Sequence, residues 1–174
     1  MDLKGKVVVI TGSSSGIGAT TALAFAKEGA KIVVNSRVNV EGGKEVVEKI
    51  KKLGGEAIYI QADVSDSKGV KRLFEEVVKR YGALDVLINN AAFPGEKVPF
   101  FEASQDDLLN LFNQNIVGAM LCSKEAIKIM KKGGKILNTS SIKGWEHGGG
   151  SITYAVTKAE INSLQFAGIV VCSD

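Results

Sequence analysis

The chain has 174 residues, of which 45% are hydrophobic and 24% are charged, and its formal net charge is +3. A chain of this length is expected to form one domain, here residues 1–174, and to bury roughly 70% of its unfolded surface without disulfide or metal support. The mild charge, the two widely separated cysteines and the single histidine argue against a nucleic-acid surface, a disulfide framework and a metal site.

The apolar stretches of the sequence are short. The apolar run near the N-terminus is too brief for the core of a signal peptide, and no stretch approaches the length of a membrane span. These features predict a cytoplasmic protein with no membrane partner.

Apolar runs rich in β-branched residues alternate with amphipathic stretches along the chain. Strands are expected at 6–11, 31–36, 56–62, 85–90 and 134–140, and helices at 17–28, 41–53, 68–81, 104–132 and 151–167. Ser104 and Asp107 have capping-box spacing at the start of the fourth helix, and Gly133 and Gly134 are expected to end it. Five successive βα units predict an α/β fold with a doubly wound parallel sheet of the Rossmann type. Residues 168–174 could add a short sixth strand.

The sequence TGSSSGIG, residues 11–18, follows the first expected strand and opens the first expected helix. Glycines permit a tight turn and close approach of a ligand to the backbone, and the N-terminus of the helix attracts an anion. The missing Lys-Ser/Thr ending argues against a P-loop. The residues expected to bind a phosphate here are Gly12, Ser14, Ser15, Gly16, Ile17 and Gly18. A plain glycine-rich turn is the alternative.

The second expected strand ends in Asn35, Ser36 and Arg37. A dinucleotide fold that holds the ribose 2′-hydroxyl usually carries an acidic residue at this point, and none is present. Arg37 can pair with a 2′-phosphate through its guanidinium group. The sequence therefore favours NADP over NAD, and the alternative role of Arg37 is a solvated loop charge.

Three further segments follow in order. NNAA, residues 89–92, closes the fourth expected strand; NTSS, residues 138–141, closes the fifth; and YAVTK, residues 154–158, lies in the last expected helix. Together with the glycine-rich turn, in this order and spacing, they resemble the short-chain dehydrogenase/reductase family over residues 7–165. The resemblance implies an oxidoreductase that interconverts a small-molecule secondary alcohol and a carbonyl compound, such as a sugar dehydrogenase or a 3-oxoacyl-thioester reductase.

The resemblance implies four catalytic residues. Tyr154 would be the acid/base, Lys158 would also hold the nicotinamide ribose, Ser141 would hydrogen-bond the substrate oxygen, and Asn115 would hold a water of the proton relay. An ammonium about 4 Å from a phenol supplies about 4 kcal/mol at an effective dielectric near 20, or about three pKa units. Because Lys158 is one helical turn from Tyr154, we expect it to lower the pKa of Tyr154. Taken singly, Ser141 could be only a strand-end hydroxyl and Asn115 only a packing residue.

The resemblance also implies cofactor contacts besides those of Tyr154 and Lys158. Asp63 would contact the adenine amine, with Val64 beside it, and Asn89 and Ala91 would line the cofactor. Asp63 could instead be only the cap of the next helix. Family members commonly carry glycine in place of Ala92, so a positive φ at this position would strain the alanine.

The family comparison extends to the C-terminus. Relatives continue past this length with a strand, a Pro-Gly turn that binds the nicotinamide carboxamide, a helical substrate lobe and a final strand. The chain is therefore expected to lack the substrate lobe and the last strand. The family implies a homo-oligomer in which the last helix packs on a partner subunit, whereas Glu160 puts a charge in that helix where many relatives carry a small apolar residue.

The sequence leaves two rivals to an NADP-preferring oxidoreductase. One is a catalytically weak nucleotide-binding relative that acts only through association with another chain. The other, a methyltransferase-like α/β binder, shares a glycine-rich first turn but leaves Ser141, Tyr154 and Lys158 unexplained.

Overall fold

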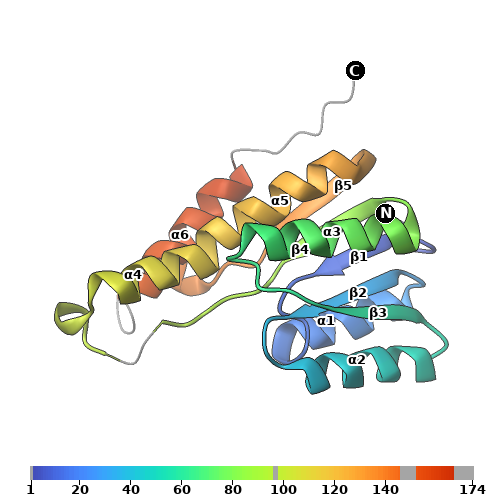
Figure 1. The fold of residues 1–174 in the computed structure, drawn as a ribbon, viewed down its shortest axis with the longest axis horizontal. Coiled ribbons are helices and arrows are strands. Elements are labelled where there is room, and N and C mark those ends of the chain that lie inside the picture. The colour runs from blue at the N-terminus through green and yellow to red at the C-terminus, as the bar shows by residue number, and fades with distance from the viewer. Residues whose placement is uncertain (1, 96–97, 146–151, 167–174) are drawn as a thin grey trace.

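The computed structural model describes residues 2–95, 98–145 and 152–166 of the chain. In these residues five strands form one sheet of order β3-β2-β1-β4-β5, and all neighbouring strands run parallel (Figure 1). The strands are β1 (Val7–Ile10), β2 (Lys31–Ser36), β3 (Glu56–Gln61), β4 (Leu84–Asn89) and β5 (Met130–Asn138). The chain builds outward from β1 in one direction and then returns to build in the other, as in a doubly wound sheet. This order confirms the predicted fold class.

Helices cover both faces of the sheet. They are α1 (Gly16–Lys27), α2 (Val40–Lys52), α3 (Ser67–Tyr81), α4 (Gln105–Phe112), the π-helical turn η2 (Asn113–Val117), α5 (Gly118–Ile129) and α6 (Ile152–Phe166), with short 3-10 turns η1 (Phe100–Glu102) and η3 (Ile142–Gly144). α1 and α2 pack on one face and α3 and α5 on the other. α6 packs against α4, η2, η3 and β5, on the side of the molecule away from β3 (Figure 1).

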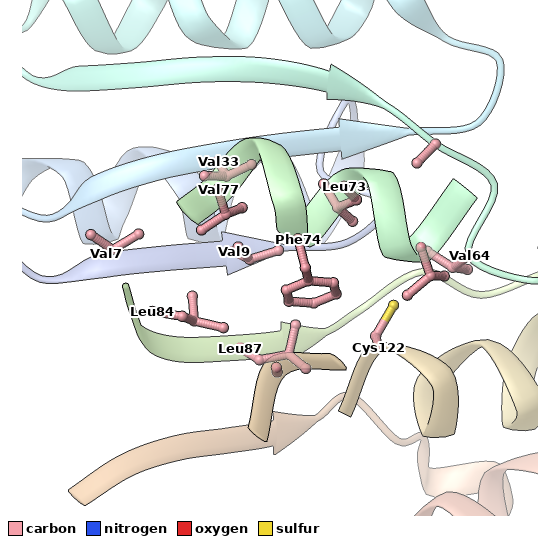
Figure 2. Packing of buried hydrophobic residues seen from close by; sticks show 13 residues of the cluster. Val7, Val9, Val33, Val64, Leu73, Phe74, Val77, Leu84, Leu87 and Cys122 are labelled. Carbon is pink, nitrogen blue, oxygen red and sulfur yellow. The ribbon is translucent and has the colours of Figure 1, made fainter. Parts of the chain in front are cut away.

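The core is divided by the alternation of side chains along each strand. Val7 and Val9 of β1 join the cluster under α3 and α5, whereas Val8 and Ile10 join the cluster under α1 and α2. Figure 2 shows the first cluster, in which the ring of Phe74 points from α3 toward the sheet. Both faces of β1 are buried, which explains why its sequence is a continuous apolar run rather than an alternating one.

The predicted helix over 104–132 forms with two corrections. It is one helical rod interrupted by the π-helical turn η2, and it ends at Ile129, earlier than expected. Met130 takes an extended conformation and pairs with Leu84, so β5 begins four residues before the predicted start. Gly133, with a φ of 82°, lies in an irregularity where the register with β4 shifts, and it does not cap the helix.

The predicted helix ends are otherwise confirmed to within a residue or two. Ser104 and Asp107 form the expected capping box at the start of α4. Asp66 caps α3 by accepting hydrogen bonds from two backbone N–H groups, and Gly82 ends it in the left-handed conformation. The predicted sixth strand at 168–174 lies outside the described residues. Within the part of the chain that the structure describes, no helix is long and apolar enough to cross a membrane.

Candidate active site

The turn between β1 and α1 needs its glycines. Gly12 and Gly16 have φ values of 62° and 54°, in the left-handed region that glycine adopts without strain. A Cβ on Gly12 would lie 2.7 Å from the Cα of Ala91, and one on Gly18 would lie 2.5 Å from the Nδ2 of Asn90. The missing side chains therefore let the turn approach the segment that follows β4.

Hydrogen bonds hold these two segments together. The Thr11 hydroxyl accepts from the backbone N–H groups of Asn90 and Ala91, each at 3.0 Å. The Nδ2 of Asn90 donates back to the carbonyl oxygens of Thr11 and Gly12, at 3.0 and 3.1 Å. The turn is thus held in place before any ligand arrives.

The N-terminus of α1 has unused donors. Ser15, the N-cap residue, makes no side-chain hydrogen bond to the helix, and the first turn carries no acidic residue. Backbone N–H groups at such a position, together with the helix dipole, attract an anion. A Cβ on Gly16 would meet open space, so the backbone at this point is accessible.

A cavity of about 340 Å³ lies beside this turn, and we call it the glycine-turn pocket. Its lining includes nine residues predicted from the sequence: Gly12, Ser14, Ser15, Ile17, Gly18, Arg37, Asp63, Val64 and Ala91. The other lining residues, which the sequence motifs do not single out as ligand contacts, are Asn35, Ser36, Val38, Asn39, Ala62, Asn90, Ala92, Phe93 and Gln114. Gly16 lines a separate surface groove between α1 and α2. Most of these other lining residues lie at the C-terminal end of a strand or within a few residues after it. That position is the signal that could have found them, because ligands bind at the carboxyl ends of parallel strands.

Asn89 does not line the glycine-turn pocket. It is buried, and its Nδ2 donates to the carbonyl oxygen of Ala119, to the Ser123 hydroxyl and to Oδ1 of Asn138. These bonds tie the end of β4 to α5 and β5. Because side chains alternate along an extended segment, it is the next residue, Asn90, that faces the glycine-rich turn.

Ala92 is not strained. Among the described residues only glycines have positive φ values, so the backbone at Ala92 does not require the glycine that family members commonly carry there.

Arg37 and Asp63 lie at the mouth of the glycine-turn pocket. The Nη1 of Arg37 is 3.8 Å from the Oδ2 of Asp63. Asp63 is not the cap of α3, a role that Asp66 fills; its Oδ1 accepts from the backbone N–H and the hydroxyl of Ser65. Both side chains are part-exposed and can meet a ligand.

Ser141 and Tyr154 are brought together by η3 and α6. The Ser141 hydroxyl accepts from the backbone N–H of Lys143 at 3.2 Å, which orients it at the start of η3. Burial raises the pKa of Tyr154 above its ordinary value, and a side-chain hydrogen bond with Ser141 acts in the opposite direction. The pKa of Tyr154 is therefore raised and not lowered as expected from Lys158, because burial of the phenol outweighs the Ser141 hydrogen bond.

Lys158 lies under the ring of Tyr154. Its Nζ is 5.6 Å from the ring centroid and donates to the carbonyl oxygen of Thr139 at 2.7 Å. The residue is 3% exposed, and burial lowers the pKa of its ammonium group. The ammonium group is therefore held by the backbone at the end of β5, close to the Tyr154 ring.

Asn115 links the pocket to α6. Its Oδ1 accepts from the backbone N–H of Phe93 at 2.7 Å, and its Nδ2 donates to the Phe93 carbonyl at 2.9 Å. The same Nδ2 donates to the Thr157 hydroxyl at 3.1 Å. Since Phe93 lines the glycine-turn pocket and Thr157 lies between Tyr154 and Lys158, Asn115 joins the pocket wall to the helix that carries the phenol and the amine.

The site thus has two parts. One part is a pocket with an anion-attracting helix end, a guanidinium group and a carboxylate. The other is a phenol hydrogen-bonded to a serine hydroxyl, with a buried amine one helical turn away. Such an arrangement can bind a dinucleotide and exchange a proton with an oxygen of a second molecule.

Comparison with known proteins identifies the family. A family model described as "short chain dehydrogenase" matches residues 6–167. The chain belongs to the short-chain dehydrogenase family. This confirms the resemblance seen in the sequence.

Two curated relatives have similar sequences. An uncharacterized oxidoreductase from Thermotoga maritima is 41% identical over 169 residues, which cover 94% of this chain and 64% of the relative. A 3beta-hydroxysteroid dehydrogenase from Mediterraneibacter gnavus is 36% identical over 160 residues, which cover 91% of this chain and 58% of the relative. The chain therefore spans less than two thirds of the length of these family members.

Solved structures of the family have the same fold. A short chain dehydrogenase from Burkholderia cenocepacia in complex with NADP is 32% identical, with a TM-score of 0.88 over 94% of this chain and 67% of that one. The NADH-dependent reductase A1-R′ complexed with NAD is 29% identical, with a TM-score of 0.89 over 95% of this chain and 72% of that one. The family thus includes structures with either dinucleotide.

Proposed function

We propose that this short-chain dehydrogenase family member transfers a hydride between NADP(H) and a secondary alcohol or carbonyl compound, with Tyr154 as the acid/base. The observation that carries the proposal is the meeting of Ser141 and Tyr154, from η3 and α6, with Lys158 one helical turn below. Hydride transfer to a carbonyl leaves an oxygen that needs a proton, and a positioned phenol can supply it.

The glycine-turn pocket fits the adenosine and phosphate half of a dinucleotide. The open N-terminus of α1 suits the pyrophosphate, and the pocket mouth carries Arg37, whose guanidinium group suits a 2′-phosphate. Ser36 ends β2, where an acidic residue would favour NAD. Because solved relatives contain either NADP or NAD, the preference for NADP rests on these residues of the chain, and NAD is the alternative.

The chain's own residues have distinct roles in the proposed reaction. The bound nicotinamide would supply or accept the hydride. Tyr154 would give its proton to the carbonyl oxygen during reduction and take it back during oxidation, while the Ser141 hydroxyl would hydrogen-bond the same oxygen. The raised pKa keeps Tyr154 protonated near neutral pH, the form that reduction needs.

Two further residues support this centre. Lys158 would stabilise the phenolate left after proton transfer, because its ammonium group lies close to the Tyr154 ring in a buried setting. Asn115 would hold the pocket wall against α6, so that cofactor and phenol keep their separation. A role of Asn115 in holding a relay water stays a prediction, as do the cytoplasmic location and the homo-oligomer.

The test is turnover by the full chain. NADPH absorbance should fall in the presence of ketones from a panel that includes oxoacyl thioesters and keto sugars. Tyr154→Phe should lower the rate by roughly 10²–10⁴-fold. The variant should still bind 2′,5′-ADP, because the substitution lies outside the glycine-turn pocket.

Two results would contradict the proposal. Equal turnover by wild-type and Tyr154→Phe protein would remove the phenol from the mechanism. NADPH binding without turnover on any substrate of the panel would instead favour the nucleotide-binding alternative, although the relatives' names as dehydrogenase and oxidoreductase do not favour it.

A further inference from the structure

Arg37 and Asp63 form an ion pair at the mouth of the glycine-turn pocket. Arg37 follows β2 and Asp63 follows β3, and their closest charged atoms are 3.8 Å apart. The two side chains are 47% and 33% exposed, and both line the pocket. Any anion that reaches Arg37 therefore meets a guanidinium group that already faces a carboxylate.

The carboxylate of Asp63 is anchored on the side away from Arg37. Its Oδ1 accepts from the backbone N–H and the hydroxyl of Ser65, at 2.9 and 2.7 Å. The Ser65 hydroxyl in turn accepts from the Nε2 of Gln114 at 3.1 Å. These bonds leave Oδ2 as the oxygen that faces the guanidinium group.

The backbone of Arg37 is anchored as well. The Nε2 of Gln61 donates to the Arg37 carbonyl oxygen at 2.8 Å. The Asp63 carboxylate and the Arg37 backbone are thus both held by hydrogen bonds, and the guanidinium group and the carboxylate face each other at the pocket.

We propose that Asp63 weakens the chain's preference for a 2′-phosphate by competing with that phosphate for Arg37. The inference rests on the proposed function, since it concerns the same nucleotide site. A 2′-phosphate must share or replace the carboxylate partner of Arg37 and is repelled by the carboxylate itself. A nucleotide with a free 2′-hydroxyl meets neither cost. Asp63 therefore reduces the difference in binding affinity between the nucleotide with the 2′-phosphate and the nucleotide without it.

The test compares two fragments that share the adenosine part. Calorimetry would give the affinities of the full chain for 2′,5′-ADP and for 5′-AMP, and their ratio measures the preference for the 2′-phosphate. Any adenine contact of Asp63 affects both fragments and cancels in the ratio. Asp63→Asn keeps an oxygen for Ser65 and removes the charge, and the ratio should rise by about 1.5- to 5-fold, the range of exposed ion pairs.

Arg37→Ala supplies the matched background. The ratio should fall in this variant, and adding Asp63→Asn to it should raise the ratio by less than in the wild-type background. Circular dichroism would establish that each variant is folded. An unchanged or lower ratio in Asp63→Asn, or an equal rise in both backgrounds, would overturn the inference while leaving the proposed function standing. If folded wild-type protein binds neither fragment, the proposed function fails and the inference fails with it.

Discussion

Tyr154 illustrates how burial and hydrogen bonding oppose each other at one side chain. Burial raises its pKa, and the hydrogen bond with Ser141 counters part of that rise. Ser141→Ala should therefore raise the pKa of Tyr154 further, because the phenolate loses a partner. The titration of Tyr154 is measured by ultraviolet absorbance as the difference between a protein with Tyr154 and the same protein with Tyr154→Phe. This difference is recorded against pH in the wild-type background and in the Ser141→Ala background, and the two curves are compared. An unchanged titration would contradict the hydrogen-bond account.

Gly18 marks the closest approach between the glycine-rich turn and the segment after β4. A Cβ there would lie 2.6 Å from the Gly12 carbonyl oxygen as well as 2.5 Å from Asn90, and the backbone atom cannot move away independently. Gly18→Ala should therefore lower the free energy of unfolding by about 1–3 kcal/mol and weaken binding of 2′,5′-ADP. Urea unfolding and calorimetry measure the two effects.

Thr20→Ala is the control for that substitution. It lies on the same helix and removes only an exposed hydroxyl bond to the Gly16 carbonyl oxygen, so it should leave both quantities nearly unchanged. Equal effects of the two substitutions would show that the close contacts at Gly18 are not the cause.

The sequence identifies half of the residues that line the glycine-turn pocket, and it names Asn89 where the structure places Asn90 in the lining. Asn89 and Asn90 are identical residue types in succession, and only the register of β4 decides which one faces the glycine-rich turn. The pair of Arg37 and Asp63 is also beyond sequence reasoning, because it depends on how β2 and β3 align at their ends. The spacing of Tyr154 and Lys158 does not predict the raised pKa of Tyr154, because burial of the phenol depends on the tertiary fold.

In the helical rod of α4, η2 and α5, the sequence predicts the start of the rod but neither its end nor its π-helical turn. Capping residues fix its start, and the spacing of Ser104 and Asp107 predicts it correctly. Its end is set by pairing of Met130 with Leu84, a long-range contact that local sequence does not contain. The π-helical turn that carries Asn115 has no local signal either, although such turns often mark functional positions.

η3 and α6 position Ser141 against Tyr154, and Gly144 lets them approach. A Cβ on Gly144 would lie 2.7 Å from the Lys158 backbone carbonyl carbon, so no side-chain rotation relieves the contact. Gly144→Ala should push η3 away from α6 and reduce turnover by about 10²-fold, the scale of an ångström-sized misplacement. Affinity for 2′,5′-ADP should stay within about twofold, because the glycine-turn pocket lies on other elements.

Steady-state rates and calorimetry on the same preparation separate these effects. Unchanged turnover would contradict the packing argument. A parallel loss of nucleotide affinity would show instead that the substitution damages the whole fold.

Across the described part of the molecule, the strands and the apolar side chains differ in how far they are buried. Strands β1 and β4 are buried along their whole length, whereas β5 is an outer strand of the described sheet with Leu137 exposed. Apolar side chains such as Phe101 and Met120 are also exposed. The chain spans less than two thirds of the length of these two curated relatives.

Asp85 connects the first and fourth strands and gives a test of acid stability. It accepts from the backbone N–H of Val7 at 2.9 Å and pairs with Lys6 at 3.1 Å. Burial acts to raise its pKa, but these two partners outweigh it and hold the pKa below the ordinary value of 3.8. The stabilisation is therefore present above about pH 4 and is lost as the pH falls through the lower folded-state pKa.

Asp85→Asn should lower the free energy of unfolding at neutral pH by about 1–2 kcal/mol. It should also flatten the acid limb of a plot of unfolding free energy against pH, because the titrating group is gone. Urea unfolding at a series of pH values measures both. If the acid limb of Asp85→Asn is as steep as that of the wild type, the loss of stability in acid comes from carboxylates other than Asp85.

A crystal structure of the full chain with NADP would show whether the glycine-turn pocket and Tyr154 form one active site. We expect a pyrophosphate at the N-terminus of α1, a 2′-phosphate against Arg37 and a nicotinamide ring beside the Tyr154 hydroxyl. A dinucleotide bound away from the glycine-turn pocket, or a nicotinamide ring out of reach of Tyr154, would contradict this expectation.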